Sequence, residues 1–405
     1  MCWNVDANGA ARSRTSLAAF LSLALLSSCT AAGDGRGSPD ATVRTDSAGV
    51  EIITSLRPLW SAAQGWSISA EPDLQIGQAD GGAGDVLHGV TAIRHLGESI
   101  LVAQATELRL FGQDGSFVGR LGGAGRGPGE FSRIADALPC EDRVYASELS
   151  PPQLIVFEPS GQSTTLPLPP AETQGFLNPL APLLGCTPLG VIGGMSGPLQ
   201  EGGSSTGVHR RSSLVVHLRL DGTGVDTLIS FQGPETYSGL RVPFGRNTLV
   251  GAADTLLYLA ETGEPEFRVL GLDGRTHRVV RLEMPVRSVT SDDIERIRAQ
   301  YLDGLSPGIV AEIQPRLDAV PIPATMPYFS QLKVSTDGTV WLQHYQPFRE
   351  EEVTRWAAVD PTGAWLGDVS LPNSFAVHEF HADYVIGLWR DEFDVEFVRR
   401  YSIQR

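Results

Sequence analysis

Short runs of β-branched, aromatic and aliphatic residues recur along the chain from about position 49 to position 403, and Gly, Pro, Asp and Ser separate them. Runs of this length bounded by turn-forming residues are typical of β-strands, because helices need longer segments with apolar positions three and four residues apart. The clearest runs lie at 99–102, 154–157, 214–218, 267–270, 340–342 and 385–389. The pattern predicts an all-β fold.

A common unit connects these runs: a strand, an acidic or polar turn that ends in Gly, and a second strand. Glycine suits such a turn because a tight hairpin requires positive φ at a central position. The turn glycines stand at 115, 161, 222, 274 and 363, so successive ones are 46, 61, 52 and 89 residues apart. A four-stranded propeller blade takes about 40–50 residues, so the first four turns fit one blade each.

Residues 375–403 supply one more set of strands, which makes six units. An open ring of blades would leave unpaired strand edges, so a strand from the other end of the chain must complete one sheet. The apolar run at 49–53 is the candidate, and we expect it to pair in the same sheet as the strands of 375–405. The sequence therefore predicts a six-bladed β-propeller that spans residues 43–405.

One stretch within the longest interval has a helical pattern. Thr290 or Ser291 can cap a helix, apolar side chains follow on one face, and Gly304 can end it; a second short helix fits 307–315. We expect a small helical insertion between blades, at about 287–327, packed on one face of the ring. It would either cover exposed apolar side chains or form a lid over the central channel.

The segment 117–122 (FVGRLG), followed by 125–131 (GRGPGEF), resembles the six-bladed propellers related to NHL repeats, a family abundant among exported bacterial lipoproteins. The segments 46–52 (DSAGVEI) and 332–341 (LKVSTDGTVW) are also similar to that family. The resemblance covers residues 43–405. It implies the fold and no particular activity.

The N-terminus has the pattern of an export signal. Arg12 and Arg14 precede an uncharged apolar run at 16–26, which matches a signal-peptide core and is shorter than the ~20 residues of a membrane span. The run ends at Cys29 in Leu-Ser-Ser-Cys, which resembles the lipobox of bacterial lipoproteins. The resemblance implies that residues 1–28 are a signal peptide and that Cys29 is lipidated. A lipid on Cys29 would make the membrane a partner of the chain.

Residues 29–42 are mostly small and polar and cannot bury enough surface to order themselves, so we expect a flexible tether. The residue after Cys29 is Thr30 rather than the Asp that retains some lipoproteins at the inner membrane. This favours an exported, lipid-anchored protein of the cell envelope, on the outer membrane, facing the periplasm or the surface.

The chain is strongly acidic, with a formal net charge of -16. Removal of Arg12, Arg14 and Asp6 with the signal peptide takes away a net +1, so the mature chain carries -17. Such a surface repels phosphate backbones, and we expect no nucleic-acid partner.

Three motifs with possible chemistry are better explained structurally. Residues 203–207 match G-x-S-x-G, but the required strand-to-helix turn is missing, so a surface loop is expected. His378 and His381 miss the H-E-x-x-H spacing by one, and on a strand they would point to opposite faces and could not share a zinc ion. The glycines at 122–129 do not fit a dinucleotide-binding motif, and Glu130 and Phe131 would tie that turn to the next blade. We assign no catalytic residue, metal ligand or cofactor.

Four basic side chains lie at or near strand ends beside apolar runs: Arg241, Arg246, His344 and Arg390. In an acidic protein they could mark a pocket for an anionic ligand. The alternative is that they form ordinary ion pairs with the many carboxylates.

The cysteines that follow Cys29 are Cys140 and Cys186, which are 46 residues apart, about one blade. Each precedes an apparent strand, so they should occupy equivalent places in neighbouring blades. A disulfide requires Cα atoms within ~7 Å, which is met near the axis, where blades converge. Farther out they would be two buried thiols.

The fold class does not assign a function. A binding or interaction module for a protein or small-molecule ligand is the interpretation we favour. A propeller hydrolase or lactonase with a metal site in the central channel is the alternative, and a structural partner in an envelope complex is a third. Several carboxylates aimed at one point of the channel would indicate the enzyme, and a hydrophobic or mixed lining the binding module.

Overall fold

The computed structural model describes residues 41–405 apart from 62–63, 79–85, 169–179, 197–206, 222–223 and 349–350. The predicted signal peptide, the lipobox, nearly all of the tether and all but the last residue of the G-x-S-x-G segment lie outside the described residues. Among the described residues, neither helix combines the length and apolar character that crossing a bilayer would require.

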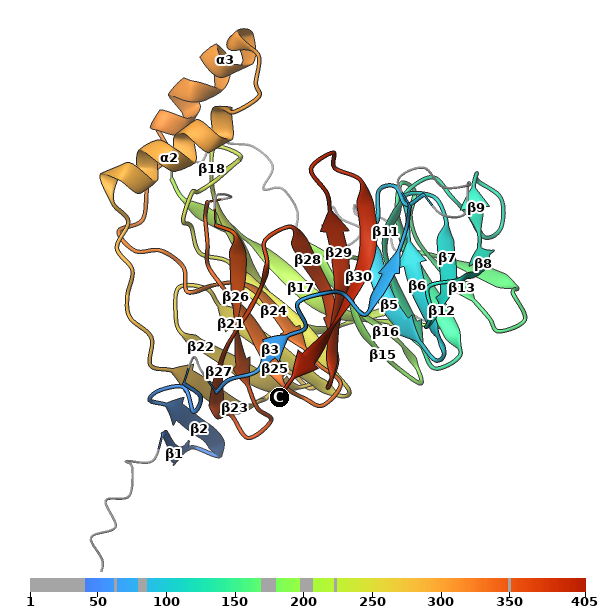
Figure 1. The fold of residues 1–405 in the computed structure, drawn as a ribbon, viewed down its shortest axis with the longest axis horizontal. Helices are drawn as coiled ribbons and strands as arrows, with labels where there is room; N and C mark the ends of the chain where they lie inside the picture. The colour runs from blue at the N-terminus through green and yellow to red at the C-terminus, as the bar shows by residue number, and fades with distance from the viewer. Residues whose placement is uncertain are drawn as a thin grey trace, which may run out of the picture. The chain divides into compact units, whose positions relative to one another are not determined.

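Six sheets, antiparallel apart from one parallel strand pair in blade 4, form the blades of a propeller (Figure 1). The first strand of each blade contacts the first strand of the next, and β28 contacts β5 to complete the ring. The strands of each blade are given from the axis outward. Blade 1 contains β5 (Ala92–Leu96), β6 (Ser99–Ala103), β7 (Leu108–Gly112) and β8 (Phe117–Leu121), and blade 2 contains β11 (Ile134–Cys140), β12 (Arg143–Leu149), β13 (Pro152–Phe157) and β14 (Ser163–Pro167). Blade 3 contains β15 (Leu183–Thr187), β16 (Gly190–Ser196), β17 (His209–Arg219), β18 (Val225–Tyr237) and β19 (Leu240–Arg241).

The remaining blades follow the same plan, and two of them include strands from the N-terminal part of the chain. Blade 4 contains β20 (Thr248–Ala253), β21 (Leu256–Glu261), β22 (Glu266–Gly271), β23 (Thr276–Leu282), β2 (Val50–Ser55) and β1 (Thr42–Ser47). Blade 5 contains β24 (Phe329–Val334), β25 (Val340–His344), β26 (Val353–Val359) and β27 (Trp365–Pro372). Blade 6 contains β28 (Phe375–Phe380), β29 (Tyr384–Arg390), β30 (Glu396–Gln404), β3 (Ser67–Ile68) and β4 (Leu74–Ile76). The prediction of six blades is confirmed.

The predicted closure of the ring is wrong in its choice of strand. The run at 49–53 forms most of β2, which pairs in parallel with β23 at the outer edge of blade 4. Blade 6 is completed instead by β3 and β4, which both pair antiparallel with β30. The closing strands still come from the N-terminal part of the chain, but from residues 67–76.

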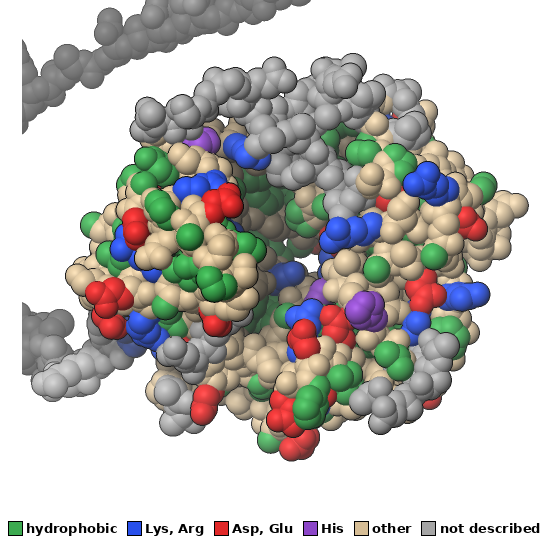
Figure 2. Space-filling model, turned by 90° about the horizontal axis from the view of Figure 1, so that it is seen from above, with side chains coloured by type: hydrophobic (Ala, Val, Ile, Leu, Met, Phe, Trp, Pro, Cys, Tyr) green, Lys and Arg blue, Asp and Glu red, His purple; other side chains and the backbone are tan. Residues whose placement is uncertain are grey.

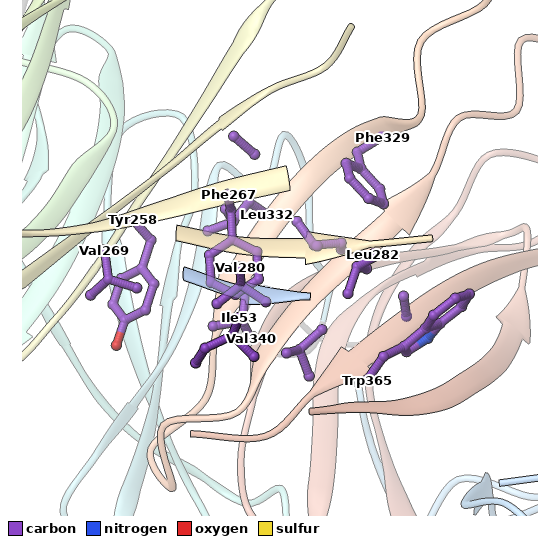
Figure 3. Close-up of a cluster of buried hydrophobic side chains, with 14 residues drawn as sticks. Ile53, Tyr258, Phe267, Val269, Val280, Leu282, Phe329, Leu332, Val340 and Trp365 are labelled. Carbon is purple, nitrogen blue, oxygen red and sulfur yellow. The ribbon is translucent and has the colours of Figure 1, made fainter. Parts of the chain in front are cut away.

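Packing between blades explains where β2 goes. Ile53 is fully buried in a cluster made by blades 4 and 5, together with Phe267, Val280, Val340 and Trp365 (Figure 3). A side chain of this size fills the space between the two sheets, and each such burial contributes about 1.5–3 kcal/mol. The strand therefore joins two blades rather than closing the ring.

The turn glycines have the predicted conformation where the structure describes them. Gly115 and Gly363 have φ of +82° and +85°, and residue 222 lies outside the described residues. Gly363 is also constrained by its neighbour, because a Cβ atom there would lie 2.7 Å from Ile53 Cδ1.

The loop between blades 1 and 2 behaves as expected for the GPGEF segment. The Gly127 N–H donates to the Glu130 carboxylate at 2.7 Å, which holds the turn. The next residue, Phe131, is fully buried among apolar side chains of both blades. The glycines and proline therefore serve a tight connection between blades.

The helical insertion is confirmed, with α2 (Ser291–Leu302) and α3 (Pro307–Asp318). Thr290 is the N-cap of α2 and forms a capping box with Asp293. Ile297 packs with Phe244 and Met326, which belong to connections between blades. The described helices contribute no side chain to the two cavities of the central channel. The contacts of Ile297 therefore favour a helical insertion that covers apolar side chains over one that forms a lid on the channel.

Cys140 and Cys186 form a disulfide with a Cα–Cα distance of 6.2 Å. Cys140 ends β11 and Cys186 lies on β15, so both are on the first, innermost strands of neighbouring blades. Of the two alternatives that the sequence leaves open, the structure therefore contains the disulfide near the axis and not two separate buried thiols.

Candidate functional site: the central channel

The centre of the ring is hollow, and Lys or Arg side chains are visible within it in Figure 2. A cavity of about 360 Å³ lies there, lined by the innermost strands of the blades. A second cavity of about 270 Å³ shares part of its lining with the first, including Pro182, Leu332 and Lys333. The polar side chains of the larger cavity are Arg94, His95, Lys333, Thr336, His378, Glu379 and His381, and its other walls are mainly apolar.

The innermost strands of the blades place these side chains. Arg94 and His95 lie on β5, Lys333 lies on β24, and Glu379 lies on β28. Neighbouring residues of these strands line the cavity together, as Leu332 and Lys333 do, because the innermost strand is the part of a blade nearest the axis.

Arg94 links two carboxylates. Its Nη2 atom lies 3.2 Å from Asp136 Oδ1, and its Nε atom lies 3.7 Å from Glu379 Oε1. Asp136 also accepts the backbone N–H groups of Ala137 and Leu183, both at 2.8 Å. Burial raises the pKa of Asp136, against the opposing effect of the Arg94 charge. This group ties four blades together at the axis.

Glu379 is held by two neighbours besides this arginine. It accepts the His95 N–H at 2.9 Å, and His381 Nε2 lies 3.3 Å from the same oxygen. The His381 ring stacks on Tyr384 with a centroid distance of 4.3 Å. Burial alone would raise the pKa of Glu379, but the His381 hydrogen bond and the Arg94 charge lower it overall. The carboxylate is thus ionised at neutral pH.

His378 and His381 both line the larger cavity, as do Glu379 and Phe380 between them. A β-bulge between Val377 and Glu379 interrupts the alternation here, and His381 lies beyond the end of β28. His378 Nδ1 accepts the Ile93 N–H at 3.2 Å, and burial holds the pKa of this imidazole well below its usual value. Within the part of the chain that the structure describes, no group of three or more His, Cys, Asp or Glu side chains could hold a metal ion.

Lys333 is the one lysine of the 405-residue chain. Among the described residues, its ammonium group has no hydrogen bond or ion pair, and its exposed surface faces the channel. Burial and the nearby Arg94 charge lower the pKa of Lys333 to about 8, although Asp136 and Glu379 act in the opposite direction. It is the basic group of the cavity that is left available to a ligand.

The predicted candidates Arg241, Arg246, His344 and Arg390 line neither channel cavity. His344 Nε2 lies 3.1 Å from Asp368, and the Arg390 guanidinium lies 2.8 Å from the Glu396 carboxylate.

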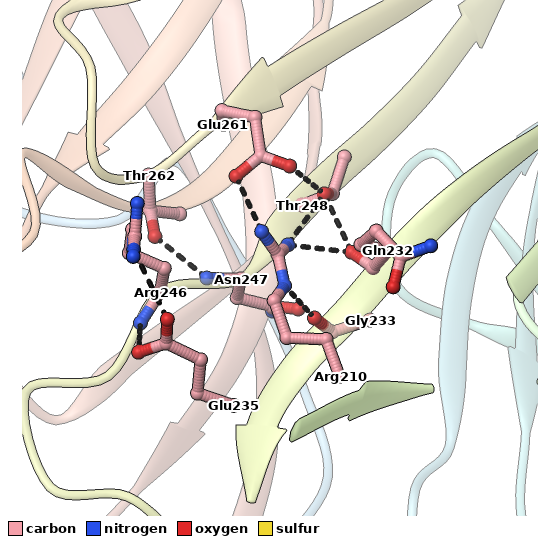
Figure 4. A network of polar contacts seen from close by, with 9 residues as sticks. All are labelled: Arg210, Gln232, Gly233, Glu235, Arg246, Asn247, Thr248, Glu261 and Thr262. Atoms are coloured by element: carbon pink, nitrogen blue, oxygen red, sulfur yellow. Dashed lines mark hydrogen bonds and ion pairs between the residues drawn. The ribbon is translucent and has the colours of Figure 1, made fainter. Parts of the chain in front are cut away.

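Arg246 belongs to a polar network between blades 3 and 4 (Figure 4). Its Nε atom lies 3.0 Å from the Glu235 carboxylate. In the same network Arg210 of β17 contacts Glu261 and Thr248, which belong to blade 4, both at 2.9 Å. For Arg246 and Arg390 the structure shows the ion-pair alternative, His344 lies beside Asp368, and Arg241 is exposed on β19.

Sequence reasoning missed the residues that the channel brings together. Lys333 had a readable signal, because it is the one lysine among 31 basic residues. Arg94, Asp136 and Glu379 had none, since nothing in their local sequence separates an innermost strand from an outer one.

No protein-family model matches the chain, and no curated protein matches it either. Among solved structures, a member of the DUF4221 family from Bacteroides vulgatus has a TM-score of 0.54 at 9% identity, over 84% of this chain and 99% of that one. A Bacteroides fragilis protein provisionally described as exported has a TM-score of 0.47 at 12% identity, over 87% and 100%. Virginiamycin B lyase from Staphylococcus aureus has 0.42 at 7%, over 83% and 99%. These likenesses concern the fold.

Proposed function

We propose that this chain is an exported, lipid-anchored protein of the cell envelope, and that its propeller binds a small anionic molecule in the central channel. The observation that carries the binding role is the ammonium group of Lys333, which has no partner among the residues that the structure describes and faces a cavity of about 360 Å³. Cavities of about 300–1,000 Å³ are typical of small-molecule sites.

The charges of the channel support an anion. The Arg94 guanidinium is engaged by the Asp136 and Glu379 carboxylates. Lys333 is therefore the cation of this cluster that a ligand in the cavity can contact directly. Because the chain as a whole has a formal net charge of -16, it repels anions in general. An anion would be held only where a local cation such as Lys333 outweighs this repulsion.

The export and anchoring parts rest on two features. The N-terminal pattern implies a signal peptide that ends before Cys29. The disulfide between Cys140 and Cys186 supports an oxidising compartment, since disulfides persist mainly outside the cytosol.

The lining supports a binding module over the hydrolase alternative. The carboxylates nearest the axis are engaged, Asp136 by Arg94 and two backbone N–H groups and Glu379 by His95 and His381. They do not converge with other described side chains on a point where a metal ion could sit. The lining is mixed, with charged, imidazole and apolar groups.

Calorimetric titration of the detergent-solubilised protein with acetate, lactate, succinate and citrate tests this function. We expect at least one of these anions to bind, and Lys333→Met to weaken it about tenfold or more, because losing a hydrogen bond to a charged group costs about 1.5–3 kcal/mol. The matched control is Arg246→Met, which removes an ion-paired cation outside the channel. Absence of binding, or equal losses in the two variants, would contradict the proposal.

A further inference from the structure

The chain uses arginine at every basic position except 333. Arginine stays protonated in proteins, whereas a lysine amine can lose its proton and become a nucleophile. The single amine side chain of the protein therefore lies in the channel, where the cavity gives it room for a reaction partner.

The surroundings favour the reactive form of this amine. With a pKa of about 8, about one Lys333 side chain in ten is unprotonated at pH 7. Its nitrogen lone pair is not taken up by any described residue. A desolvated amine beside another cation, here Arg94, is a recognised way to activate a lysine nucleophile.

Groups that can move protons share the cavity. Glu379 and His381 line it together with Lys333, and the two side chains contact each other at 3.3 Å. Addition of an amine to a carbonyl needs a proton at the carbonyl oxygen, and loss of water needs a second one. Glu379 is ionised, so the His381 imidazole, which this carboxylate holds, is the group of the pair that can relay these protons.

We propose that Lys333 captures a small oxo acid, an aldehyde or ketone that carries a carboxylate, as a covalent imine. The inference rests on the proposed function, because it takes the channel as the ligand site. The lysine nitrogen bonds to the carbonyl carbon while the C=O π pair moves to oxygen, which takes up a proton. The resulting carbinolamine loses its hydroxyl group as water, nitrogen loses its protons, and a C=N bond remains. The reaction needs no oxidant or reductant and reverses on addition of water.

The experiment is reductive trapping of the full-length protein with pyruvate and sodium cyanoborohydride at pH 7.5, followed by peptide mass spectrometry. We expect one reduced adduct per chain, on Lys333, and none at that position in Lys333→Arg, which keeps the positive charge. A thermal unfolding curve of Lys333→Arg establishes that it is folded. Peptide mapping separates any reaction at the α-amino group.

Lactate, which has the carboxylate but a hydroxyl in place of the carbonyl, separates the two proposals. If lactate binds and pyruvate leaves no adduct on Lys333, the channel is an anion site and the covalent inference is overturned. If neither molecule binds and no adduct forms, both proposals fail. An adduct that lactate suppresses by competition supports both.

Discussion

Replacement of Lys333 by methionine should change how stability depends on pH. In the folded protein the pKa of Lys333 is lowered to about 8 from 10.5, first by burial and then by the Arg94 charge. The unfolded chain therefore holds the lysine proton more tightly than the folded one. Below about pH 8 both states are protonated and burial of the charge opposes folding; between about pH 8 and 10.5 stability rises, because the folded state releases its proton first.

The size of the effect follows from the two pKa values. Each pKa unit corresponds to about 1.36 kcal/mol, so the full difference is about 3 kcal/mol, of which about 2 kcal/mol falls between pH 7.5 and 10. Methionine has a similar length and no charge. We expect Lys333→Met to be more stable than the wild type at pH 7.5, and this advantage to shrink by about 2 kcal/mol at pH 10.

Urea unfolding followed by tryptophan fluorescence at the two pH values measures this difference. Tyrosines also titrate near the upper limit, and burial raises the pKa of Tyr384 to about 12. They are common to both proteins, so their effect cancels when the variant is compared with the wild type. A stability difference that stays constant with pH would refute a buried lysine with a lowered pKa.

Three further predictions concern the fold and the anchor. Leu74→Ala in the closing strand β4 should lower the free energy of unfolding by about 2–5 kcal/mol, because Leu74 is buried. The control Val43→Ala, in the exposed outer strand of blade 4, should lower it by less than about 1 kcal/mol. Equal losses for the two variants in urea unfolding would argue against closure by β4. Thiol titration in denaturant without reductant should find Cys140 and Cys186 unreactive, and two reactive thiols per delipidated chain would exclude the disulfide. Mass spectrometry of the N-terminal peptide from native membranes should show acylated Cys29, and an unmodified N-terminus near residue 29 would defeat the lipoprotein assignment.

The fold could be predicted to the number of blades because the Gly-containing turns repeat at about blade length. The closing strand could not, since β4 has three residues and gives no strand signal of its own, whereas the longer run at 49–53 does. Tertiary packing decides where the run at 49–53 lies, because Ile53 fits between blades 4 and 5.

The site was harder to predict than the fold. The four chosen cations lie at strand ends, and strand ends are also where surface ion pairs form, as Arg246 and Glu235 show. The channel residues share one property, that they lie on or next to the innermost strand of a blade. Which strand is innermost depends on the order of strands in each sheet, and the local sequence does not reveal that order. Near His378 the alternation of side chains along the strand is also no guide, since a bulge between Val377 and Glu379 interrupts it.

A nuclear magnetic resonance titration of protein labelled with carbon-13 at the lysine ε position tests the central claim most directly. The chain contains one lysine, so one side-chain signal reports on the channel. We expect a titration midpoint near the pKa of about 8 and a shift of the signal when lactate is added. A midpoint near 10.5, the ordinary lysine value, together with no response to lactate or pyruvate, would contradict the channel as the ligand site.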